Sequence, residues 1–237
     1  LVVVSVVAAL VAGVSFGGPL NKADIVSNAK WAVHFDVDKF LAGKLGKLMT
    51  DETTNEDLKK GLNVLRATLH IDPLKDVKSV TLYGDNYRQD GGVAVVKGVE
   101  NVEAINALQA IITASKTHEE VNYGGKIIHK WIDEKKQKPS VLCFYAPGVT
   151  VLGGDLEKIK AAVDVLGSKK ECLRDGAGLT MPNSAGFLVI GGMKDGSTNG
   201  PASAAVLRNA DWLALSAGNS AENVEIEARL GANSEEN

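Results

Sequence analysis

Residues 140–154, SVLCFYAPGVTVLGG, decide the expected fold. They contain two apolar stretches separated by Pro147-Gly148, a pair typical of tight turns, and this pattern predicts a β-hairpin. The next residue, Asp155, is a typical helix N-cap. Apolar side chains then follow at helical spacing, at Leu156, Ile159, Val163 and Leu166. A hairpin that leads directly into a helix predicts a protein with mixed α and β structure.

The same patterns continue toward the N-terminus. Residues 31–38 (WAVHFDVD) alternate apolar and polar side chains, which predicts a half-buried strand. Helices are predicted at residues 39–49, 53–69 and 101–112, and further extended segments at 77–84, 92–98 and 120–132, the last with a kink at Gly124 and Gly125.

The order of these elements predicts the fold class. Residues 31–132 give strand, helix pair, strand, strand, helix and strand, which is the ferredoxin-like βαββαβ order extended by the hairpin and its helix. We therefore expect an α+β fold with antiparallel sheets and helices on one face. The other face would be left for solvent, a partner or a second module.

A second, partial copy of this pattern follows. The stretch FLVIGGM resembles the first strand, and residues 202–209 resemble a short helix that precedes two further strands. This order indicates a degenerate duplication whose second copy is truncated. The expected domain organisation is a module at 25–167, a linker at 168–185 that is rich in glycine and polar residues, and the start of a second module at 186–237.

Residues 1–18, LVVVSVVAALVAGVSFGG, carry no charge, and the first charged residue is Lys22. The small residues before Pro19 and the richness in valine, alanine and glycine favour a signal peptide. An uncleaved N-terminal anchor and a buried core strand are the alternatives. The first two place the rest of the chain outside the cytoplasm, so we expect a secreted or periplasmic protein of the cell envelope. A membrane contact would involve only this segment, if it is uncleaved.

Composition and motifs exclude several function classes. The net charge of −3 and the pI of about 5.9 argue against a nucleic-acid partner. The segment 13–17 (GVSFG) matches the nucleophile-elbow pattern G-x-S-x-G, but it ends the apolar leader and no helix follows it. The segment 153–155 (GGD) lacks the rest of a glycine-rich nucleotide motif. No cofactor is expected.

His34, Asp36 and Asp38 form the sharpest polar cluster. On a continuous strand, these three side chains would project from one face, where imidazole and carboxylate groups can bind a cation. The same alternation is also what a solvated strand face requires. His129 shares a strand face with Trp131, which indicates either cross-strand packing or a ligand platform, while nothing singles out His118.

The two cysteines allow one disulfide. Cys143 lies in an apolar strand and Cys172 in a polar connection, and an oxidising compartment would permit them to pair. A buried, unpaired thiol at Cys143 is the alternative.

Three stretches carry a resemblance to a known kind of protein: GVAVVKGVENVEAINALQ, YGGKIIHKWID and VTVLGGDLEKIKAAVDVL. Together they resemble the repeating module of exported bacterial proteins of unknown function. The resemblance covers residues 25–167 and continues more weakly to residue 237. The resemblance implies an exported α+β envelope protein, and it carries over no site residues.

The expected function is therefore a non-catalytic binding or structural role in the cell envelope. The partner would be an envelope component or a hydrophobic ligand. A metal-dependent hydrolase that uses His34, Asp36 and Asp38 is the alternative enzyme, and a structural subunit without a ligand is a third possibility.

Overall fold

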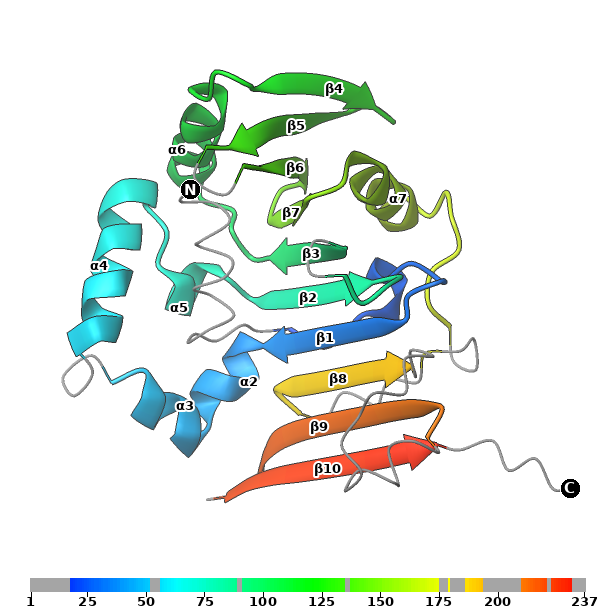
Figure 1. The fold of residues 1–237 in the computed structure, drawn as a ribbon. Coiled ribbons are helices and arrows are strands. Elements are labelled where there is room, and N and C mark those ends of the chain that lie inside the picture. Colours follow the sequence, from blue (N-terminus) through cyan, green and yellow to red (C-terminus); the bar gives the residue numbers. More distant parts are fainter. Residues whose placement is uncertain are drawn as a thin grey trace, which may run out of the picture.

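The computed structural model shows an α+β protein built on one antiparallel sheet of ten strands (Figure 1). The sheet order is β10-β9-β8-β1-β2-β3-β7-β6-β5-β4. The structure describes residues 18–51, 56–88, 91–134, 137–174, 179, 186–193, 210–220 and 223–231. Residues 1–17 of the expected leader, the expected helix at 202–209 and most of the expected linker lie outside these ranges.

The helices and strands follow one another in sequence as follows. The first half of the chain contains η1 (Lys22–Asp24), β1 (Trp31–Asp36), α2 (Val37–Ala42), α3 (Lys44–Met49), α4 (Glu56–Leu69), α5 (Pro73–Asp76), β2 (Ser79–Gly84), β3 (Gly92–Lys97) and α6 (Val102–Thr113). The second half contains β4 (Glu119–Tyr123), β5 (Lys126–Asp133), β6 (Lys138–Ala146), β7 (Val149–Gly153), α7 (Leu156–Leu166), β8 (Leu188–Met193), β9 (Trp212–Ser220) and β10 (Asn223–Gly231).

Local sequence signals explain several of these boundaries. Strands β6 and β7 form the predicted hairpin, and Gly148 in its turn has a φ of 68°. Asp155 caps α7, because its side chain accepts hydrogen bonds from the first backbone amides of the helix. Gly124 and Gly125 both have positive φ, as a two-residue hairpin turn between β4 and β5 requires. The expected kink at 120–132 is therefore a complete hairpin.

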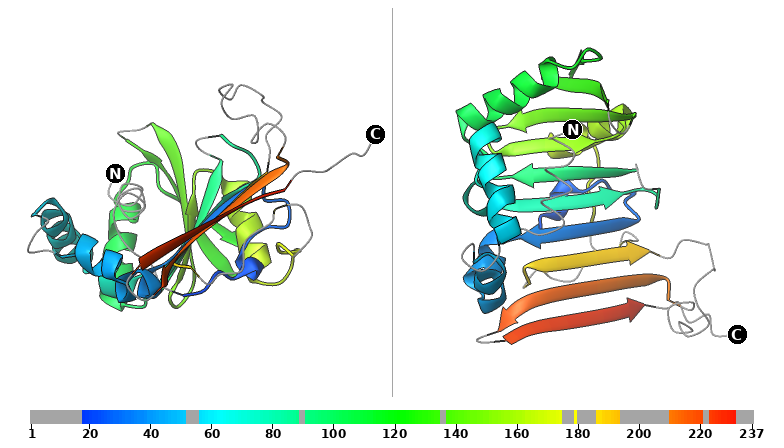
Figure 2. Two further views of the ribbon diagram at one scale, coloured as in Figure 1. Left: turned by 90° about the horizontal axis from the view of Figure 1, so that it is seen from below. Right: turned by 60° about the vertical axis from the view of Figure 1, so that its left-hand side comes forward.

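Both faces of the central sheet are buried. Val93 and Val95 of β3 belong to a core cluster shared with α7, while Ala94 and Val96 belong to a second cluster shared with α4 and α6. Figure 2 (left) shows α7 on one side of the sheet and α4 and α6 on the other. The prediction that helices cover only one face is therefore wrong. A continuous apolar run such as Val93–Val96 is typical of a strand that is buried on both sides.

The structure does not show the ferredoxin-like arrangement or the duplication that were expected from the sequence. Strands β1, β2 and β3 are direct antiparallel neighbours. Strands β8 to β10, the expected second module, extend this same sheet, because β8 pairs with β1 and β9 pairs with β8. Figure 1 shows these three strands at one end of the sheet. Among the described residues, no helix is long and apolar enough to span a membrane.

Candidate functional site

The structure places His34 in the interior of the protein. The residue is 1% exposed, and its Nε2 lies 2.9 Å from the carbonyl oxygen of Gly18. A carbonyl only accepts hydrogen bonds, so Nε2 carries the proton and Nδ1 accepts from the Thr81 hydroxyl at 2.9 Å. Both ring nitrogens of His34 are therefore used within the chain.

Asp36 and Asp38 are separated by the end of the strand. Strand β1 ends at Asp36, which caps α2 by accepting a hydrogen bond from the backbone amide of Lys39 at 2.9 Å. Asp38 lies inside α2, where its carboxylate contacts Lys78 at 3.4 Å. The single strand face that was expected for the three residues therefore ends before Asp38, since the capping signal of Asp36 starts a helix there. A metal site at these residues stays a prediction.

We expect His34 to make the stability of the protein depend on pH. Burial lowers the pKa of the His34 imidazole, and the Gly18 hydrogen bond and Asp36 oppose this only in part. A histidine with a lowered folded pKa contributes stability above its unfolded pKa of about 6.5, and this stability is lost as the pH falls further. The free energy of unfolding should therefore decrease between pH 7 and pH 5 in urea titrations.

The variant His34→Gln is the matched test, because glutamine keeps one donor and one acceptor but does not titrate. Its unfolding free energy should depend less on pH than that of the wild type. Burial also lowers the pKa of His129, so some dependence should remain. If the unfolding free energy of His34→Gln depends on pH as strongly as that of the wild type, the lowered pKa of His34 is contradicted.

Both predicted disulfide partners are free cysteines in the structure. Cys143 lies buried in β6, and burial raises the pKa of its thiol to about 11, which disfavours the reactive thiolate. Cys172 is half-buried and its backbone pairs with that of Val26. The pairing of Cys143 with Cys172 stays a prediction.

A hollow of about 300 Å³ lies between the start of α7 and the β2–β3 connection. Its lining is mainly apolar, and this composition is typical of sites that bind small ligands. The apolar and glycine residues that line it are Val26, Tyr83, Gly84, Gly91, Val93 and Ala161. The polar lining residues are Asn28, Asp85, Asp155, Glu157 and Lys158.

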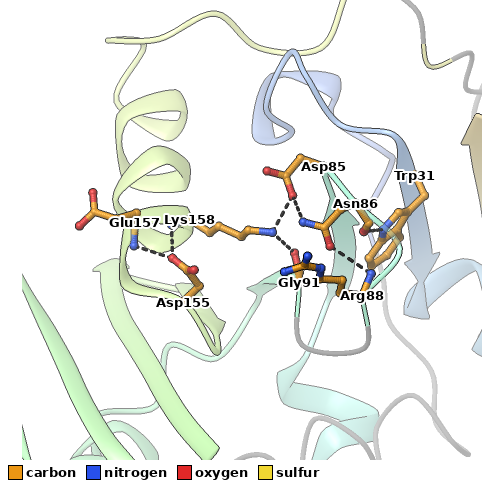
Figure 3. A network of polar contacts seen from close by, with 8 residues as sticks. All are labelled: Trp31, Asp85, Asn86, Arg88, Gly91, Asp155, Glu157 and Lys158. Atoms are coloured by element: carbon orange, nitrogen blue, oxygen red, sulfur yellow. Dashed lines mark hydrogen bonds and ion pairs between the residues drawn. The ribbon is translucent and has the colours of Figure 1, made fainter. Parts of the chain in front are cut away.

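Lys158 joins the two walls of this hollow (Figure 3). Its ammonium group reaches from α7 across to Asp85 Oδ1 at 2.6 Å and to the carbonyl oxygen of Gly91 at 2.8 Å. Asp155, which caps the same helix, accepts hydrogen bonds from the backbone amides of Glu157 and Lys158 at 2.8 and 3.1 Å. The start of α7 is thus already occupied by a carboxylate, which disfavours an anion at that place.

The start of the β2–β3 connection, residues 85–88, is held in place by polar contacts within itself and with Trp31 of β1 (Figure 3). The Trp31 indole nitrogen donates to the carbonyl oxygen of Asn86 at 2.7 Å, and the Asn86 amide donates to Asp85 Oδ1 at 2.7 Å. The backbone amide of Arg88 donates to the Asn86 side chain at 3.0 Å. The Asp85 carboxylate is therefore positioned before any ligand binds.

The charges of the hollow favour a cation. Its described lining carries the three carboxylates of Asp85, Asp155 and Glu157 and the single ammonium group of Lys158.

Tyr83 also lines the hollow, and its buried hydroxyl has no hydrogen-bond partner among the described residues. Burial raises the pKa of this hydroxyl well above its usual value, so it stays protonated. Buried polar atoms without a partner are rare and can mark functional sites.

Comparisons with known proteins identify neither a family nor a function for this chain. No protein-family model matches the sequence, and no curated protein matches it. The chain is similar to the solved structure of TP0453 in its crystal form IV, with a TM-score of 0.47 and 10% identity. The alignment covers 90% of this chain and 81% of that one. A likeness at this level does not identify a shared function.

Sequence reasoning did not find the hollow. Asp155 was predicted as a helix cap, but nothing in the sequence places Asp85 beside it. Asp85 and Asp155 line the same hollow because β3 and β7 pair, with Val93 opposite Gly153. A covariation between residues 85 and 158 would have been the signal, and a single sequence does not contain it.

Proposed function

We propose that this protein is an exported binding protein without catalytic activity, and that the hollow between α7 and the β2–β3 connection takes its ligand. The observation that carries the proposal is a mainly apolar hollow whose rim holds three carboxylates against one lysine. The predicted export segment at residues 1–18 supports a place in the cell envelope.

The chemistry of the rim indicates the class of ligand. An apolar body would contact Val93 and Ala161, and a positively charged amine would take the place of the Lys158 ammonium group on Asp85. The Lys158 side chain is 22% exposed and lies near the start of its helix, so it can turn toward solvent when an amine enters. We therefore expect an amphiphilic amine as the ligand.

Three eight-carbon probes test this charge preference by isothermal titration. Octylamine, octanol and octanoate have similar apolar bodies and carry positive, zero and negative charge. Octylamine should bind most tightly and octanoate most weakly, because the net charge of the described lining is negative. Lys158→Met should strengthen octylamine binding, since it frees the Asp85 carboxylate. Equal affinities for the three probes, or a preference for octanoate, would overturn the proposal.

A further inference from the structure

A second polar cluster lies at the end of the sheet formed by β4 and β5 (Figure 1). It lies on the face opposite α7, because Ile128 belongs to the α7 core and the next residue, His129, points the other way. The register of the hairpin places Glu120 opposite His129, so their side chains project from the same face. His118 precedes β4 and brings its ring over the ring of His129, with centroids 5.3 Å apart and planes tilted by 24°. Three potential metal ligands thus meet at one place.

The loop that carries His118 is fixed to the hairpin. The Thr117 hydroxyl accepts a hydrogen bond from the backbone amide of Ile132 at 2.9 Å, and the backbone amide of His118 donates to the carbonyl oxygen of Ser115 at 3.1 Å. The side chain of His129 is 3% exposed, and its ring packs edge-on against Phe144 with a centroid distance of 6.0 Å. Both imidazoles are therefore held in place before a metal arrives.

The distances between the donor atoms fit a first-row metal ion. His118 Nε2 lies 3.0 Å from His129 Nδ1, which in turn lies 3.8 Å from Glu120 Oε1. All three donor atoms lie within 4.8 Å of one another. Tetrahedral Zn²⁺ with bonds of about 2.0–2.1 Å separates its ligand atoms by about 3.3 Å. The Glu120 side chain is 48% exposed, so it is free to close the remaining gap.

We propose that His118, Glu120 and His129 form a binding site for a divalent late first-row metal ion, with Zn²⁺ as the probe. Imidazole ligands favour zinc and its neighbours over magnesium and calcium. Three protein ligands leave the fourth tetrahedral position to water or to an external ligand. The site is independent of the proposed ligand hollow, which lies against α7 on the opposite face of the sheet.

Titration of the purified, chelator-treated protein with Zn²⁺ tests this site. One Zn²⁺ should bind per chain. His118→Ala should weaken Zn²⁺ binding by more than about 100-fold, because it removes a direct ligand. Losing a residue that only hydrogen-bonds to a metal ligand already lowers metal affinity by about 10- to 100-fold. Glu120→Gln should weaken it by at least about tenfold, since the neutral amide is a poorer ligand than the carboxylate.

Two matched controls separate the site from general surface binding. Glu119→Gln changes the neighbouring exposed carboxylate, which pairs with Lys130 and not with the histidines, and should leave Zn²⁺ binding unchanged. His70→Asn removes an exposed histidine elsewhere and should also have no effect. Ala161→Trp, which fills the hollow, should bind Zn²⁺ like the wild type and so keeps the two proposals apart.

The alternative is that the histidine pair only shares an internal hydrogen bond. In that case the wild type would bind no Zn²⁺, or would bind it equally well with and without His118. Either result would overturn the proposal. Circular dichroism of each variant checks that its fold is retained.

Discussion

Replacing Ile128 with alanine should lower the free energy of unfolding by about 3 kcal/mol. Ile128 is fully buried on the face of β5 that belongs to the α7 core. The substitution removes three carbon atoms from a closely packed core and leaves a cavity, which explains the large effect. Urea denaturation should show a lower midpoint with an unchanged m-value.

The adjacent residue provides the control. Ile127 points to the opposite face of β5 and is 48% exposed, so Ile127→Ala should change the unfolding free energy by only about 0.5 kcal/mol. Equal effects at the two positions would contradict the burial of the α7 face at β5. The pair therefore tests whether α7 covers its face of the sheet at β5.

Replacing Gly98 with alanine should be similarly destabilising, by about 3 kcal/mol. Gly98 follows β3 with a φ of 116°, a conformation that side chains with a Cβ rarely adopt. A Cβ at this place would also lie 2.5 Å from the carbonyl oxygen of Asp76 and from the backbone nitrogen of Lys78. Backbone atoms on both sides cannot yield easily, so the strain and the overlap add. Thermal unfolding and urea titration measure the loss.

Gly61 is the matched control for Gly98. It lies in the exposed middle of α4, where a Cβ would meet nothing within 4 Å. Gly61→Ala should therefore stabilise the protein by about 0.5–1 kcal/mol, because alanine favours the helix. A stabilising Gly98→Ala would show that the chain after β3 does not follow the path described.

The local elements could be predicted because short-range signals determine them. The Pro147-Gly148 turn, the Asp155 cap and the alternation from Trp31 to Phe35 each act over a few residues. The sheet order could not be predicted, because strand pairing depends on contacts between distant residues. The apolar run at Val93–Val96 did carry the signal for two buried faces. The alternation predicts a strand over 31–38, but β1 ends two residues earlier because Asp36 caps α2.

The two candidate sites differ in how far the sequence alone predicts them. The hollow joins Asp85 to Lys158 across the sheet, which a single sequence does not reveal. The histidine site had a usable signal: a two-residue turn at Gly124-Gly125 necessarily pairs Tyr123 with Lys126, and three steps further it pairs Glu120 with His129. The hairpin at Gly124-Gly125 therefore brings these two residues together.

The ligand that we propose for the hollow beside α7 is an amphiphilic amine. Titration of Ala161→Trp and Ala110→Trp with octylamine shows whether the amine binds there, because Ala161 lines the hollow and Ala110 is an exposed residue on α6. We expect Ala161→Trp to weaken octylamine binding by about tenfold or more, while Ala110→Trp should bind like the wild type. Equal binding by Ala161→Trp and the wild type would contradict it.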